Sequence, residues 1–173
     1  RISEQINSCS DIDDWYELYR KLVFWEMELS QTETNMDEML EMQKAEANSE
    51  FCKFVKRNYE SWVTGDNHPL MSHELFKRKV FPLLDGGEKV CFILIDNFRL
   101  DQWRIIQPIL AEHFTIEEDL YTTILPTATQ YARNAIFSGL MPLQIEKMFP
   151  QLWVDEDSEE GKNVNESPLI QTQ

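Results

Sequence analysis

Apolar residues in the first half of the chain recur at intervals of three and four, the spacing that places side chains on one face of a helix. One such stretch covers residues 12–29, and a second covers 34–62 and opens with a threonine suited to cap a helix. TGDNHP at 64–69 interrupts the pattern, and a third helix is expected after Ser72. Three amphipathic helices with wide apolar faces predict a small helical bundle over residues 1–85.

The pattern changes after DGGEK at 85–89. VCFILI at 90–95 is a continuous apolar run rich in β-branched and aromatic residues, which is typical of a strand buried on both faces. A helix, kinked at its proline, is expected over 99–114, and a second strand over 120–125. The order strand, helix, strand, helix predicts an α/β domain with a mostly parallel sheet over residues 86–173.

Composition and charge narrow the possible functions. The chain has 173 residues, 42% hydrophobic and 12% aromatic, enough for one domain or a domain and a half with a sizeable core. Its formal net charge of -15, from 31 acidic and 16 basic residues, predicts no binding to duplex nucleic acid. The longest apolar run is too short to span a bilayer, so membrane insertion is not expected.

Three scattered cysteines, Cys9, Cys52 and Cys91, favour reduced thiols and a cytoplasmic location over a disulfide framework. The acidic, polar segment 154–167 predicts a mobile loop. Because the first residue is Arg rather than Met, we expect the chain to begin inside a longer protein.

Two short segments at the ends of the expected strands carry residues suited to phosphoryl transfer. Asp96 follows the first strand, and Thr129 follows the second, within PTATQYARN. Taken alone, an Asp after a strand is usually a turn former, and a Thr before a helix is usually its N-cap. Ligands of open α/β sheets bind at the carboxyl ends of the strands, so the pair favours a metal site. There a carboxylate holds a divalent ion, and the ion activates a hydroxyl oxygen.

LIDNFRLDQW resembles the first metal-binding motif of the alkaline phosphatase superfamily, in the branch of nucleotide pyrophosphatase/phosphodiesterases. PTATQYARN resembles the nucleophile segment of the same branch. The resemblance implies that Asp96 is a zinc ligand, that Thr129 is both nucleophile and ligand of the same ion, and that Thr127 supports the loop. It also implies two zinc ions, with further Asp and His ligands after Thr129. Since all three histidines of the chain precede Thr129, we expect at most half of one metal site here.

Residues 15–173 are similar to response regulators of the PorX type, which join a receiver, a helical middle domain and a PglZ domain of the alkaline phosphatase superfamily. The similarity implies a role in type IX secretion, an upstream sensor kinase and a homodimer that forms on receiver phosphorylation. It also implies a zinc-dependent phosphodiesterase or phosphatase acting on a small phosphodiester or an oligonucleotide.

Two interpretations stay open on this basis. The chain is a fragment of an enzyme, or it is a non-catalytic helical module for dimerisation and signal relay with a degenerate phosphatase-like scaffold. The apolar side chains of 12–62 fit either a core or a dimer seam.

Overall fold

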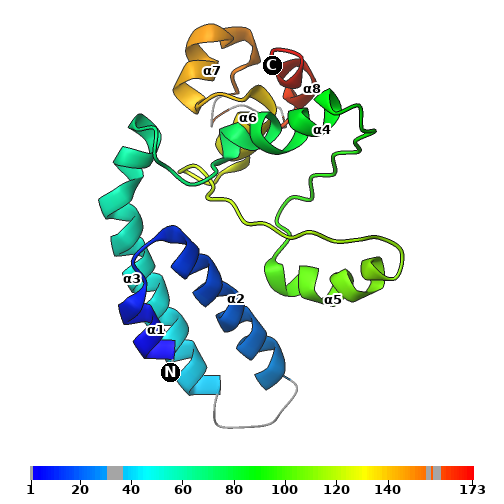
Figure 1. The fold of residues 1–173 in the computed structure, drawn as a ribbon. Helices are drawn as coiled ribbons and strands as arrows, with labels where there is room; N and C mark the ends of the chain where they lie inside the picture. Colours follow the sequence, from blue (N-terminus) through cyan, green and yellow to red (C-terminus); the bar gives the residue numbers. More distant parts are fainter. Residues whose placement is uncertain (1, 31–36, 155–156, 158–160) are drawn as a thin grey trace. The chain divides into compact units, whose positions relative to one another are not determined.

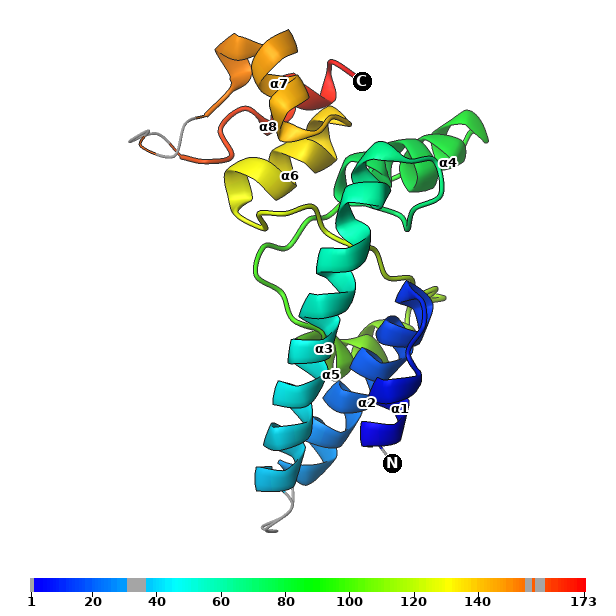
Figure 2. The same cartoon turned by 90° about the vertical axis from the view of Figure 1, so that its left-hand side faces the viewer.

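The computed structural model describes residues 2–30, 37–154, 157 and 161–173, and the regular structure of these residues is helical (Figures 1 and 2). The chain divides into two compact units. The first comprises residues 1–67 and 94–119, and the second comprises 68–93 and 120–173. Two positions of the second predicted helix, Thr34, its expected N-cap, and the apolar residue Met36, lie outside the described residues.

The described part of the first unit contains helices α1 (Ile2–Ser8), α2 (Ile12–Leu29), α3 (Asp37–Thr64) and α5 (Leu100–Ala111). Helices α1, α2 and α3 pack against one another, as both views show (Figures 1 and 2). The start of α2 is fixed by a capping box, in which the side chains of Asp11 and Asp14 each accept the backbone N–H of the other. The Asp14 N–H donates to Asp11 Oδ1 at 3.0 Å, and the Asp11 N–H donates to Asp14 Oδ2 at 3.4 Å. The helix predicted over 12–29 is therefore confirmed.

Aromatic rings fill the space between α2 and α3. The ring centroid of Trp15 lies 5.3 Å from that of Phe51 and 5.9 Å from that of Phe54, and Phe54 lies 5.7 Å from Trp62. Such tilted pairs contribute roughly 0.5–1.5 kcal/mol beyond the area that they bury. Further buried apolar side chains of this core are Ile6, Leu18, Leu22, Val23, Leu40 and Ala47.

The second unit is a chain of short helical elements. They are η1 (Ser72–Glu74), η2 (Phe76–Val80), α4 (Phe81–Asp85), α6 (Thr129–Ser138), α7 (Pro142–Met148), η3 (Pro150–Leu152) and α8 (Glu166–Ile170). Helix α6 packs against both α8 and η1. The ring of Phe76 contacts those of Phe92 and Phe137, with centroids 4.7 and 5.9 Å away. The buried apolar side chains of this unit include Met71, Ile124, Ala135, Ile145 and Leu169.

The predicted α/β fold with a mostly parallel sheet is wrong for the residues described, which are helical and contain no sheet. Residues 90–95 are irregular backbone, and Ile93 is 75% exposed where a doubly covered strand requires burial. In the segment 120–125, one parallel bridge joins Thr122 to Met71. A strand needs neighbours to take up its N–H and C=O groups, and an apolar run cannot supply them. Among the described residues no neighbouring strand lies beside 90–95, so this apolar run does not form a strand.

The remaining elements differ from expectation at their ends. Helix α5 confirms the helix predicted over 99–114 but ends at Ala111, with Pro108 inside it. Part of the expected loop 154–167 lies outside the described residues, and its last residues begin α8. The boundary between residues 85 and 86 stays a prediction. No helix in the described ranges is both long and apolar enough to cross a membrane.

Candidate functional site

Asp96 lies in an exposed turn just before α5, in the first unit. Its Oδ1 accepts the N–H of Asn97 at 2.9 Å, and Asn97 has a φ of 53°. Asn enters this left-handed region more readily than most residues, so it suits the turn at this position. The turn leaves the Asp96 carboxylate at the surface, where a cation can reach it.

The first turn of α5 is held by polar contacts that begin at Arg99. The Arg99 N–H donates to Gln102 Oε1 at 2.9 Å and so caps the helix. The Arg99 guanidinium pairs with Asp101, with Nε–Oδ1 at 2.9 Å and Nη2–Oδ2 at 2.8 Å. This pair lowers the pKa of the Asp101 carboxyl. The chain is thus fixed directly after the Asp96 turn.

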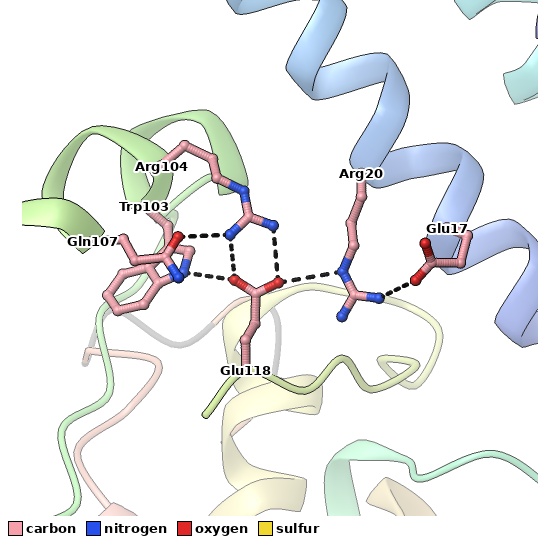
Figure 3. A network of polar contacts seen from close by, with 6 residues as sticks. All are labelled: Glu17, Arg20, Trp103, Arg104, Gln107 and Glu118. Carbon is pink, nitrogen blue, oxygen red and sulfur yellow. Dashed lines mark hydrogen bonds and ion pairs between the residues drawn. The ribbon is translucent and has the colours of Figure 1, made fainter. Parts of the chain in front are cut away.

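Glu118 is the common acceptor of three side chains of the first unit (Figure 3). Arg104 donates hydrogen bonds to both carboxylate oxygens: Nη2 lies 2.9 Å from Oε1, and Nη1 donates to Oε2. The indole Nε1 of Trp103 donates to Oε2 at 2.8 Å, and Arg20 Nε, on α2, donates to Oε1 at 3.3 Å. The hydrogen bonds from Arg104 are the main reason that the pKa of Glu118 lies below its ordinary value.

Sequence reasoning missed the contacts of Glu118. Arg20 and Glu118 are 98 positions apart, and no local pattern connects residues at that distance. The only local signal was the Trp-Arg pair on the expected helix over 99–114, and such a pair does not identify a distant partner.

Thr129 is the first residue of α6, in the second unit, and Ala128 occupies the N-cap position. Neither Thr129 nor Thr127 is therefore the N-cap, the role considered for a threonine in this segment. Thr129 is half-buried and Thr127 is exposed. At a helix start, backbone N–H groups lack intrahelical acceptors and the helix dipole is positive, so negative charge beside Thr129 is stabilised.

Helix α6 is anchored one turn beyond Thr129. Arg133 forms an ion pair with Glu166, with Nε–Oε1 at 2.7 Å, and its Nη2 donates to Oε2 at 3.0 Å. Asn134 is only 1% exposed; its Nδ2 donates to the Lys162 carbonyl at 3.5 Å, and its buried Oδ1 has no hydrogen-bond partner among the described residues. These contacts hold α6 against the segment that leads into α8. Sequence reasoning missed them because the partners come from separate segments.

The two predicted metal ligands belong to different units: Asp96 to the first and Thr129 to the second, where the supporting residue Thr127 also lies. That one ion binds both Asp96 and Thr129 stays a prediction. Within the described ranges, no three or more His, Cys, Asp or Glu side chains are grouped so as to hold a metal ion. A carboxylate and a hydroxyl are two oxygen donors, whereas zinc takes four ligands, so these residues fit a part of a zinc site.

Two histidines of the second unit, His68 and His73, are half-buried. His68 Nδ1 lies 2.9 Å from the Pro69 carbonyl and 3.4 Å from Glu74 Oε2. Burial lowers the pKa of His73, which favours its neutral form. Neither histidine was predicted as a metal ligand.

Two protein families match the sequence, and no curated protein does. Residues 1–63 match the PorX response regulator linker domain. Residues 75–173 match the BREX system PglZ alkaline phosphatase-like domain, a range that includes Asp96, Thr127 and Thr129. The similarity to PorX-type regulators is thereby confirmed. The second match covers more than half of the chain, which therefore belongs to the PglZ alkaline phosphatase-like family and carries a PorX-type linker domain in front of its PglZ part.

Proposed function

We propose that this chain supplies the nucleophile and the first metal ligand of a zinc-dependent phosphodiesterase or phosphatase, within a cytoplasmic response regulator. The observation that carries the proposal is the match of residues 75–173 to an alkaline phosphatase-like domain, because both motifs lie inside it in the expected order. By resemblance, the regulator acts in type IX secretion and takes its signal from a sensor kinase.

In this proposal each residue has a separate task. The Thr129 hydroxyl gives up its proton to water and its oxygen attacks the phosphorus of the substrate; a Thr–O–P bond forms as the bond to the leaving oxygen breaks, and water then cleaves the Thr–O–P bond to regenerate Thr129. The start of α6 stabilises negative charge on the phosphoryl oxygens. Asp96 supplies a carboxylate oxygen for zinc, and Thr127 supports the loop before α6. Two zinc ions in a complete site would lower the pKa of the attacking hydroxyl and neutralise the phosphate.

The anchoring of α6 supports the assignment of Thr129. A nucleophile has to be held in place, since small displacements of a reacting group cost large factors in rate. Arg133 and Glu166 form a two-point contact, and Asn134 is buried one turn from the helix start.

The substrate that fits is a small phosphodiester or an oligonucleotide, because a chain with a net charge of -15 repels a long duplex.

The test is hydrolysis of bis(p-nitrophenyl) phosphate in zinc by the full-length regulator that contains this chain. Thr129→Ala should lower the rate by several orders of magnitude, because it removes the attacking oxygen and a metal ligand together. Thr127→Ala is the matched control and should cost far less. A Thr129→Ala variant that keeps more than about a tenth of the activity, a loss under about 1.4 kcal/mol, would refute the nucleophile assignment.

We also propose a second function, self-association through α2 and α3 when the receiver is phosphorylated. Its supporting observation is a set of exposed large apolar side chains on these helices, namely Tyr19, Phe24, Trp25, Met39 and Met42. Trp25 is 46% exposed and Met42 67%, whereas Trp15 and Trp62 are buried in the core and are not available to a partner. A second copy would remove the exposed set from water.

Light scattering of the full-length regulator, with and without beryllofluoride, tests this second function. Beryllofluoride should produce a dimer, and Trp25→Ala should weaken it. A regulator that stays monomeric in both conditions would refute the proposal, and a dimer unaffected by Trp25→Ala would place the interface elsewhere.

A further inference from the structure

The Glu118 cluster, defined as Arg20, Trp103, Arg104 and Glu118, joins the two parts of the chain that match different families. Arg20 lies on α2, within residues 1–63, and the other three lie within residues 75–173. All four belong to the first compact unit. A single carboxylate thus receives hydrogen bonds from the linker and from the phosphatase-like part (Figure 3).

The Arg20–Glu118 ion pair is less exposed to water than an ordinary surface ion pair. The side chains of Arg20, Arg104 and Glu118 are 27%, 28% and 21% exposed, so water only partly screens their charges. Arg104 and Trp103 hold the carboxylate in one orientation, and Arg20 reaches it from α2. Arg20 also donates from Nη1 to Glu17 at 2.6 Å, which fixes the guanidinium on its own helix. The position of α2 is therefore tied to the carboxylate through a restrained side chain.

The cluster is linked to Arg99, at the start of α5, which follows the Asp96 turn. Trp103 donates its indole N–H to Glu118 and its backbone N–H to the Arg99 carbonyl, the latter at 3.0 Å. Arg99 is the N-cap of α5 and lies three residues after Asp96, and its own N–H donates to Gln102. Helix α5 also packs directly against α2.

We propose that the Glu118 cluster couples the position of α2 to the conformation of residues 96–99. A movement of α2 that pulls Arg20 away removes one donor from Glu118, weakens the hold on Trp103 and loosens the helix start behind Asp96. The coupling is reciprocal, so a ligand that orders the Asp96 turn also restrains α2. That the turn binds metal rests on the function proposed above, whereas the coupling itself depends only on contacts within the first unit.

Amide hydrogen exchange of the complete 173-residue chain, read by mass spectrometry, tests the coupling. Arg20→Gln should accelerate exchange in residues 96–103 by about fivefold or more, the lower end of ordinary coupling between sites. Glu118→Gln should accelerate this exchange more strongly, because it weakens the hydrogen bonds from all three donors. Lys53→Gln is the matched control, since it breaks a surface ion pair with Glu50 on α3, outside the cluster.

Arg20→Lys is a second variant, to be used in case Arg20→Gln fails to fold. It keeps the charge but loses the planar fork, and should accelerate exchange less than Arg20→Gln does. Exchange in 96–103 within twofold of wild type for Arg20→Gln would overturn the proposal. An acceleration spread evenly over α1, α2 and α3 would also overturn it, because that result reports general destabilisation.

The exchange measurement and the hydrolysis assay test two separate claims, so either claim can be refuted without the other. Unchanged exchange in 96–103 refutes the coupling and leaves zinc-dependent hydrolysis untouched. A full-length regulator without hydrolysis, combined with accelerated exchange in Arg20→Gln, refutes the enzymatic function and leaves the coupling in place.

Discussion

Replacing Phe54 by Ala should destabilise the first unit more than any other single truncation on α3. Phe54 is 7% exposed and its ring lies against Trp15, Trp62 and Phe51, at centroid distances of 5.9, 5.7 and 6.3 Å. Burial of such a side chain contributes about 1.5–3 kcal/mol from transfer out of water. The cavity left among three rigid rings adds to this loss, so the expected total is about 3–5 kcal/mol.

The assay is urea unfolding of the complete chain, followed by circular dichroism of its helices. Phe24→Ala is the matched control, because Phe24 is the same residue type on α2 but is 54% exposed. It should change the free energy of unfolding by less than about 1 kcal/mol. Since the chain has two units, hydrogen exchange on α2 and α3 should locate the loss in the first unit. If Phe54→Ala and Phe24→Ala differ by less than 1 kcal/mol, the aromatic core is not packed as described and the reasoning fails.

Three further predictions follow from Asp96, His73 and the number of metal donors. Asp96→Ala in the full-length regulator should lower zinc content by elemental analysis while circular dichroism stays unchanged; equal zinc in variant and wild type would remove Asp96 from the site. The pKa of His73 is lowered by burial, so the unfolded chain binds the proton more readily, and stability should fall as the pH drops below the ordinary value of 6.5. His73→Gln should flatten this dependence in urea midpoints measured from pH 7.5 to 5, and an unchanged slope would contradict it. The 173-residue chain alone should bind zinc weakly and hydrolyse no bis(p-nitrophenyl) phosphate, because two oxygen donors are too few; steady zinc-dependent turnover would show that the site is more complete than its donors indicate.

The sequence by itself determined the family and three helices of the first unit, α2, α3 and α5, but not α1. A helix pairs each N–H with a carbonyl four residues earlier, so a short window of sequence contains both partners, and the apolar spacing of 12–29 was sufficient to predict α2. The two motifs around Asp96 and Thr129 likewise lie in short continuous segments, and the family match to residues 75–173 contains both.

Only the tertiary structure decided which apolar side chains are covered and which charges meet. The apolar side chains of 12–62 suited either a core or a dimer seam, and in the structure Trp15 faces the rings of α3 whereas Trp25 is exposed. The apolar run at 90–95 suited a strand, yet a strand takes its hydrogen-bond partners from other segments, and none lies beside it in the described residues. Glu118 joins Arg20 across 98 positions for the same reason: contacts between distant segments depend on how helices pack, which local spacing does not specify.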